Sequence, residues 1–153
     1  MATDRWPTPD VCNCLALRQA ARHVSQYYDQ FLAEAGLRTS QFSILAKLRR
    51  LGPLSIKALA KQMVMDRTTL GRAMLPLERD GLIAIVRGRA DGRSKELQLT
   101  EAGLARLREA AKGWAKAQAQ FETVFGGPRA SELRALLHAV SASDLSAADP
   151  TAD

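Results

Sequence analysis

The spacing of apolar residues predicts a long helix near the N-terminus. From about residue 11 to residue 35, apolar side chains recur at three- and four-residue steps, which is the period of one helical face. Gly36 follows directly and is a natural helix stop. Residues 1–10 contain two prolines and no such period. We therefore expect a flexible arm over 1–10 and a helix that ends at Gly36.

The middle of the chain predicts three shorter helices. Thr39 or Ser40 is suited to cap the first, and Gly52-Pro53 ends it. Ser55 can cap the second, which runs to about Gln62, and Asp66 can cap the third, which runs to about residue 80. Two helices joined by so short a turn are typical of a helix-turn-helix.

A β-hairpin is predicted directly after these helices. Residues 82–87 are rich in β-branched side chains, and residues 94–99 alternate polar and apolar positions. The segment between them contains Asp91-Gly92, a turn signal. A hairpin that follows a helix-turn-helix makes a winged helix. The expected fold class is mainly α with a small β-hairpin wing, a winged helix-turn-helix joined to a helical dimerisation region.

The C-terminal third predicts two more helices. Thr100 can cap a helix over 101–125, and Pro128 is expected to be the first residue of a final helix. The long helix carries a heptad-like seam of Leu104, Leu107, Ala111, Trp114, Gln118, Phe121 and Phe125. The final helix carries an apolar stripe of Leu133, Leu136, Leu137 and Val140. Residues 143–153 are small and acidic, so we expect a disordered tail there.

Charge is concentrated in the centre of the chain. The net charge is +6, yet residues 38–95 alone hold 13 Lys and Arg against 4 Asp and Glu. A basic centre between acidic flanks indicates a surface that meets a polyanion, although a solvated basic face gives the same count. With 46% apolar residues and no long apolar run, the 153-residue chain is expected to be a soluble cytoplasmic domain with no membrane contact.

The third predicted helix of the middle segment has one core face and one polar face. On a helical wheel, Leu70, Met74 and Leu77 share the core side. The opposite side holds Thr68, Gly71, Arg72 and Leu75, and Arg67 and Thr69 flank it. The DNA-binding candidates on this helix are Arg67, Thr68, Thr69, Gly71 and Arg72. An arginine there can bond bidentately to guanine in the major groove, and a glycine permits close approach. An ordinary amphipathic surface helix is the alternative interpretation.

The hairpin tip adds a second set of cations. Its DNA-binding candidates are Arg87, Arg89, Arg93 and Lys95, with Asp91 as the single acid among them. Such a tip can lie along phosphates or enter the minor groove. Asp91 is expected to form the turn or to orient Arg93 by an ion pair.

Three motifs together resemble the MarR family of bacterial transcriptional regulators. They are LERDGLI at 77–83, DGR at 91–93 and LQLTEAG at 97–103, and the resemblance extends over residues 11–142. It implies a homodimer that binds a pseudo-palindromic DNA operator, usually as a repressor. It also implies a small aromatic or phenolic effector, and a wing acid, here Asp91, that orients Arg93.

The resemblance also implies a division of the chain. Residues 37–100 form the winged helix-turn-helix, and residues 11–36 with 101–142 form the dimerisation region. In the dimer, the two recognition helices must reach major grooves roughly 34–36 Å apart.

The first predicted helix resembles the family's organic-hydroperoxide-sensing subgroup. Cys14 matches the sensing cysteine and Tyr28 matches one of its tyrosine partners, whereas Arg18 occupies the other tyrosine position. Cys12 and Cys14 lie at a helix start near Arg18, where a thiolate is favoured. The alternative is two small buried residues. Trp114 and Tyr28 are candidates for an effector pocket, although aromatic residues at helical spacing are more often core.

Enzymatic function is not expected. The sequence shows no nucleophile–base pair, phosphate loop or cofactor fingerprint, and its two histidines and two cysteines form no metal-ligand set. We therefore expect no cofactor and no metal. The functional hypotheses are a sequence-specific repressor released by an effector, a thiol-based repressor that uses Cys14, and a non-specific architectural DNA binder.

Overall fold

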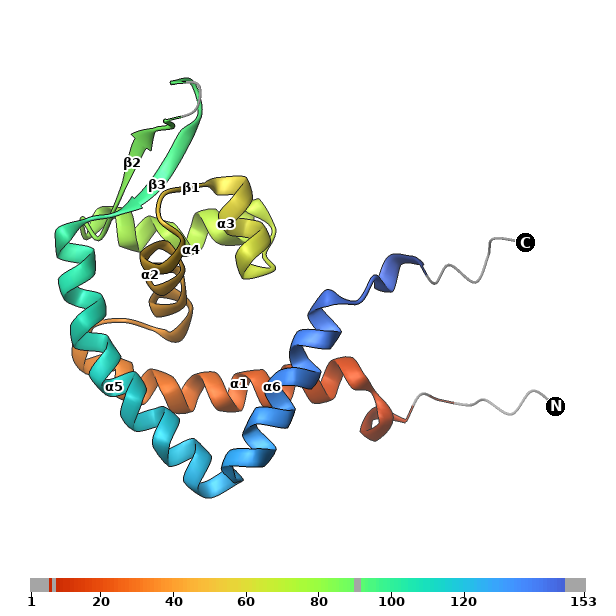
Figure 1. Cartoon of the computed structure of the whole chain (residues 1–153). Coiled ribbons are helices and arrows are strands. Elements are labelled where there is room, and N and C mark those ends of the chain that lie inside the picture. The colour runs from red at the N-terminus through yellow and green to blue at the C-terminus, as the bar shows by residue number, and fades with distance from the viewer. Residues whose placement is uncertain (1–5, 7, 90–91, 148–153) are drawn as a thin grey trace. The chain divides into compact units, whose positions relative to one another are not determined.

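The expected fold class is confirmed: the chain is mainly helical with one small antiparallel sheet (Figure 1). The computed structural model describes residues 6, 8–89 and 92–147. The chain divides into two compact units, residues 1–117 and 118–153. None of the described helices is long and apolar enough to cross a membrane.

The first unit contains the predicted helices in the predicted order. They are α1 (Asn13–Leu32), α2 (Thr39–Leu51), α3 (Ile56–Met63) and α4 (Arg67–Arg79), followed by α5 (Glu101–Phe125), which continues into the second unit. Short 3₁₀ helices lie at Pro9–Val11 and Ala33–Ala35. The first of these includes residues 9 and 10 of the segment expected to be a flexible arm.

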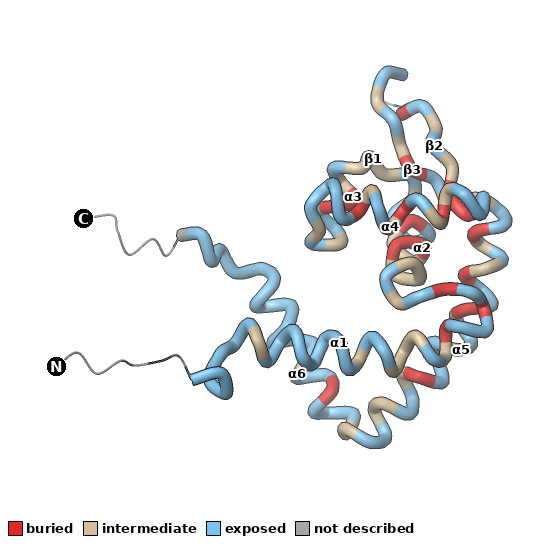
Figure 2. The backbone as a smooth tube through the Cα atoms, turned by 180° about the vertical axis from the view of Figure 1, so that it is seen from behind, coloured by how far each residue is buried: buried red, intermediate tan, exposed pale blue. Residues whose placement is uncertain are grey.

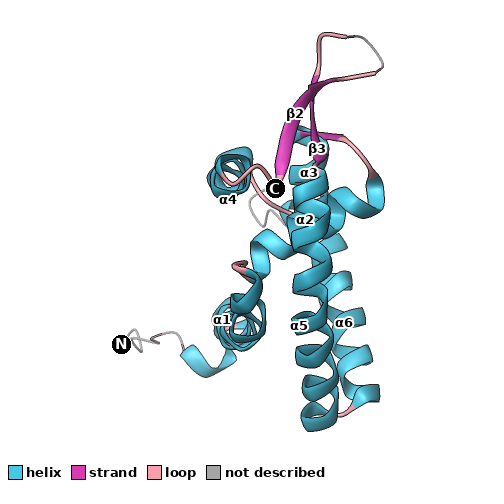
Figure 3. Ribbon diagram, turned by 90° about the vertical axis from the view of Figure 1, so that its left-hand side faces the viewer, coloured by secondary structure: helices cyan, strands magenta, loops and turns pink. Residues whose placement is uncertain are grey.

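The wing is a three-stranded sheet in the order β1-β3-β2. Strands β2 (Ile83–Arg87) and β3 (Lys95–Leu99) form the predicted hairpin, and the two-residue β1 (Leu54–Ser55) pairs with the other edge of β3. The hairpin extends beyond the helices of its unit (Figure 3). Its basic end is thereby held away from the core.

Local capping explains where several helices begin. The side chains of Ser55 and Asp66 accept hydrogen bonds from Ala58 N and Thr69 N, as the sequence predicts. Thr100 Oγ1 accepts from Gly103 N and donates to the carbonyl oxygen of Gly81, 2.7 Å away. Thr100 therefore caps α5 and links the start of that helix to Gly81, two residues after the end of α4.

The start of α2 differs from the sequence prediction. The N-cap is Arg38, and Thr39 is already the first helical residue. Asp29 on α1 accepts hydrogen bonds from both the N–H and the hydroxyl of Thr39, each at 2.7 Å. A carboxylate from another helix thus satisfies the N–H group that a local cap would otherwise satisfy.

The core lies between the winged helix-turn-helix, the end of α1 and the first part of α5 (Figure 2). The largest fully buried side chains are Leu32, Ile44, Leu45, Leu59, Leu70, Leu77, Leu82 and Leu97. Within α5, the buried positions are Gly103, Leu107, Ala110 and Ala117. Of the predicted seam, only Leu107 is buried, and Trp114 is 40% exposed. Small residues stand on α5 where other segments approach closely: a methyl group on Gly113 would overlap the carbonyl oxygen of Phe31 in α1, and one on Gly103 would overlap the carbonyl oxygen of Leu82.

The second unit contains the end of α5 and α6 (Gly127–Ala142). Helix α6 begins at Gly127, so Pro128 is its second residue rather than its first. Leu136 and Val140 of the predicted stripe are 60% and 44% exposed. A further 3₁₀ helix over Leu145–Ala147 replaces the start of the expected disordered tail, whose residues 148–153 lie outside the described part.

Candidate nucleic-acid interface

Helix α4 presents the predicted polar face to solvent because its opposite face is anchored in the core. Leu70, Met74 and Leu77 are 0%, 5% and 1% exposed. The candidate residues Arg67, Thr68, Thr69 and Arg72 are all exposed, and Gly71 is half-buried. Leu75, one turn beyond Gly71, is 61% exposed. The outer face of α4 therefore combines a guanidinium, hydroxyl groups and an exposed apolar side chain.

The carboxylate of the capping residue Asp66 occupies the N-terminus of α4. Asp66 accepts hydrogen bonds from the N–H and the hydroxyl of Thr69, at 2.8 and 2.7 Å. The backbone N–H of Thr69, its hydroxyl and the backbone N–H of Thr68 lower the pKa of the Asp66 carboxyl below its usual value. The N–H of Thr69 is thus engaged by a carboxylate, and its hydroxyl hydrogen is donated within the protein. Thr69 is better suited to position the start of the helix than to donate to a phosphate.

The wing places like charges against each other. Arg87 and Lys95 are direct cross-strand partners in the β2–β3 ladder, and both are exposed. Like charges directly opposite each other in a sheet destabilise it. A nearby polyanion removes this cost, so the arrangement is suited to phosphate contact. Arg89 and Arg93 are also exposed, beyond the ends of the two strands.

The expected partnership between Asp91 and Arg93 involves a residue outside the described part of the chain. The described ion pairs are Arg79–Asp80, Lys112–Glu109 and Arg134–Glu122. Within the described residues, the α4 and β2 cations Arg67, Arg72 and Arg87 therefore form no ion pair, and their charge is available to an external anion.

The sensing candidates do not form one cluster. Cys12 and Cys14 are both exposed free thiols, so the alternative of two buried residues is wrong. Cys12 lies just outside α1, and its Sγ accepts a weak hydrogen bond from Leu15 N at 3.4 Å. Arg18 is exposed on α1. Tyr28 is half-buried, in edge contact with Tyr27 at 5.6 Å between ring centroids, whereas Trp114 stacks on Phe42 of α2 at 6.2 Å.

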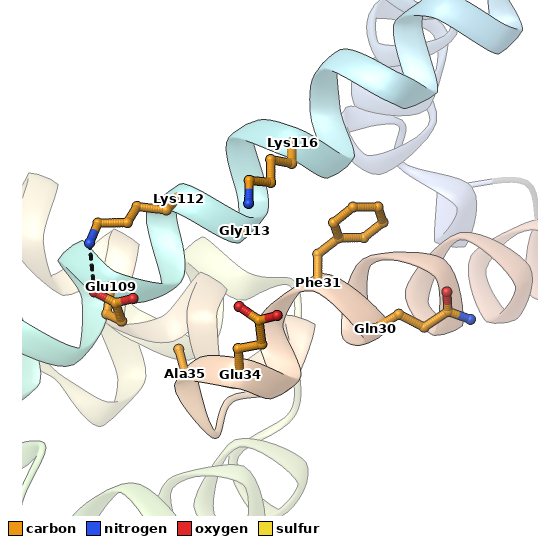
Figure 4. A pocket seen from close by; sticks show the side chains of 8 residues that line it. All are labelled: Gln30, Phe31, Glu34, Ala35, Glu109, Lys112, Gly113 and Lys116. Atoms are coloured by element: carbon orange, nitrogen blue, oxygen red, sulfur yellow. Dashed lines mark hydrogen bonds and ion pairs between the residues drawn. The ribbon is translucent and has the colours of Figure 1, made fainter.

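A cavity of about 430 Å³ lies between the end of α1 and the middle of α5, lined by none of those five candidates (Figure 4). Phe31 and Glu34 face it from the α1 side, and Lys112 and Lys116 face it from α5. Lys112 pairs with Glu109 at 2.8 Å. The carboxylates of Glu34 and Glu109 balance the two ammonium groups, so the lining carries no net charge, and Lys116 is the ammonium group that forms no ion pair among the described residues. Among the described residues, no group of His, Cys, Asp and Glu side chains could hold a metal ion.

Comparisons with known proteins identify the fold and the family. Residues 37–95 match the MarR family. The crystal structure of the Mycobacterium tuberculosis transcriptional regulator MosR is 34% identical, with a TM-score of 0.74, and the match covers 88% of this chain and 98% of that one. This chain belongs to the MarR family.

Other MarR relatives support the same assignment. MosR in complex with DNA is 37% identical, with a TM-score of 0.73 and coverage of 85% and 96% of the two chains. The organic hydroperoxide resistance transcriptional regulator of Bacillus subtilis (strain 168) is 31% identical over 64% of this chain and 66% of its own length. The match to HTH-type regulators of Bacillus cereus spans 63% of their length. These relatives are named as transcriptional regulators, a class that is not enzymatic.

Proposed function

We propose that this regulator is a homodimer that binds a pseudo-palindromic operator and represses transcription until a small effector releases it. The observation that carries the DNA-binding part is the cationic outer face of α4 together with the Arg87–Lys95 pair of the wing, both exposed. MosR, at 37% identity, has been crystallised in complex with DNA. In this proposal α4 enters the major groove and the wing follows the adjacent backbone.

The dimer part rests on apolar surface that the chain leaves uncovered. Leu136, Leu137 and Val140 follow one face of α6 and are 60%, 38% and 44% exposed. Val124, near the end of α5, is 82% exposed. Exposed apolar faces of this kind are typical of protein interfaces, and a second copy of the chain carries the same face. We assign residues 11–36 and 101–142 to dimerisation and residues 37–100 to DNA binding.

The division of labour between α4 and the wing can be tested with two arginine variants. Arg72→Ala should weaken operator binding by about 1–3 kcal/mol and relax base preference, because it removes a direct contact to a base edge. Arg89→Ala should weaken operator and random duplex by similar factors, because it removes a phosphate contact. Competition anisotropy with both duplexes measures the difference. Equal losses on the two duplexes for both variants would instead indicate a non-specific architectural binder.

The effector that we propose is a small aromatic or phenolic acid that binds in the cavity beside Phe31. Lys116, which forms no ion pair among the described residues, offers an ammonium group to its carboxylate, and the Phe31 ring offers an apolar surface. Salicylate and benzoate are suitable probes. They should raise the melting temperature of the wild type and lower its operator affinity, and Lys116→Gln should reduce both effects. A ligand-induced stabilisation that Lys116→Gln leaves unchanged would place the effector elsewhere.

A thiol switch is the second candidate function, and two observations favour it. Cys14 is exposed to an oxidant, and a relative at 31% identity is an organic hydroperoxide resistance regulator. An organic hydroperoxide would oxidise the Cys14 thiolate to a sulfenic acid and be reduced to the alcohol. Cys14→Ser should then abolish operator release by cumene hydroperoxide, while Cys12→Ser serves as the neighbouring control. Release that persists in Cys14→Ser excludes this mechanism.

A further inference from the structure

Helix α2 begins without a capping side chain of its own. Its N-cap is Arg38, and a guanidinium only donates hydrogen bonds, so it cannot accept one from the N–H groups of the first turn. The side chain of Gln41 accepts the Arg38 N–H at 3.0 Å. The N–H of Thr39 finds its acceptor on another helix, because the Asp29 carboxylate of α1 lies 2.7 Å away. The start of α2 is therefore bound to α1 by a side chain.

The bond between the two helices is double and charged. One carboxylate oxygen of Asp29 accepts both the N–H and the hydroxyl of Thr39, each at 2.7 Å. The carbonyl oxygen of Ser25, one turn earlier on α1, is a more distant acceptor for the same hydroxyl at 3.4 Å. Hydrogen bonds to a carboxylate are stronger than neutral ones, and this carboxylate also faces the positive end of α2. We call the two bonds between Asp29 and Thr39 the α1–α2 clamp.

The clamp acts on the whole winged helix-turn-helix because α2 is packed firmly against α4. Ile44, Leu45 and Leu48 of α2 belong to the same core cluster as Leu70 and Leu77 of α4. A close-packed core transmits a displacement of one helix to its neighbour rather than absorbing it. The direction in which α1 holds the start of α2 therefore also sets the direction of α4.

We propose that Asp29 is a positioning residue for operator binding, which fixes through the clamp the distance between the two α4 helices of the dimer. Successive major grooves on one side of B-form DNA lie roughly 34–36 Å apart. A winged unit that turns freely about α1 matches this distance in only a fraction of the dimers, and the affinity falls with that fraction. Asp29 acts in this way without touching DNA. This inference rests on the homodimer proposed above.

The clamp is tested by the tolerance of binding to half-site spacing. The probes are the operator that the wild type selects from a random-sequence duplex pool, and two versions with one base pair inserted or deleted between the half-sites. One base pair moves a half-site by about 3.4 Å along the duplex. The wild type should bind the native spacing more tightly than either altered spacing. Asp29→Ala should reduce that preference by roughly tenfold, the factor expected from the loss of one hydrogen bond to a charged group.

Three further variants separate positioning from charge and stability. Asp29→Asn makes the same change of charge but keeps an oxygen that accepts both Thr39 donors, so it should retain most of the wild-type preference. Thr39→Ser keeps the hydroxyl and should do the same. Ser55→Ala removes a local cap inside the winged unit, so it should lower the melting temperature and leave the spacing preference unchanged.

The outcomes distinguish this inference from the function on which it rests. If Asp29→Ala keeps the wild-type ratio of affinities between native and altered spacing, the inference is overturned and the proposed function stands. An equal loss of preference in Asp29→Asn or Ser55→Ala would also overturn it, because the effect would then come from charge or stability. If the wild type sediments as a monomer or shows no spacing preference, the proposed homodimer fails and the inference fails with it.

Discussion

Gly71 offers a direct test of the orientation of α4, because replacing it should change stability and DNA binding in opposite directions. It lies inside α4, beside Arg72 on the outer face, and a methyl group added there would meet no atom of the chain within 4 Å. In a helix interior, alanine is favoured over glycine by roughly 0.8–1 kcal/mol. For a protein of this size, that corresponds to an increase of about 2–4 °C in melting temperature.

The same methyl group lies on the face proposed to approach base edges. A close-packed interface that must accept an extra methyl group typically loses about 1–3 kcal/mol. We therefore expect Gly71→Ala to melt at a higher temperature and to bind the operator roughly 5- to 150-fold more weakly. Thermal unfolding followed by circular dichroism measures the first effect, and fluorescence anisotropy with a labelled operator measures the second.

Gly103 provides the contrasting control in another helix. A methyl group there would overlap the carbonyl oxygen of Leu82 and lie 2.7 Å from Leu99 Cδ1. That carbonyl also accepts the Thr100 N–H at 3.1 Å, so it is not free to move. Gly103→Ala should therefore destabilise the fold by about 1–3 kcal/mol despite its better helix propensity. If Gly71→Ala raises stability and leaves operator affinity unchanged, the assigned DNA face of α4 is refuted.

Three further predictions concern capping, pH and assembly. Thr100→Ala removes the α5 cap and the bond to Gly81, and should cost about 1 kcal/mol in urea unfolding, whereas Thr123→Ala, at an exposed position in the last turn of α5, should cost less. The Asp66 carboxyl has a lower pKa in the folded protein than its ordinary pKa of 3.8. Its stabilising contribution is therefore complete above pH 3.8 and is lost as the pH falls through the lower pKa of the folded state. The stability difference between wild type and Asp66→Asn should accordingly shrink in acid unfolding curves below that value; a constant difference would contradict this. Leu136→Asp should shift sedimentation velocity toward a monomer, whereas Glu132→Gln on the same helix should not.

The sequence was sufficient where structure depends on residues close together in the chain. Ser55, Asp66 and Thr100 cap their helices as predicted, because a cap is a hydrogen bond to an N–H two or three residues away. The hairpin follows equally from alternation and turn residues within one short segment. The polar face of α4 follows from helical periodicity alone, and with it the candidate residues for base contact.

Tertiary structure decided whatever depends on distant partners. Asp29 replaces a local cap at Thr39, and Trp114 stacks on Phe42; neither pairing has a signal in sequence spacing. The left-handed backbone of Val64 arises where α3 must end and turn into α4, although its residue type favours extended structure. Hydrogen bonds within a few residues form from local geometry, whereas burial and strain are set by which segments the folded chain brings together, and that is why only the tertiary structure reveals them.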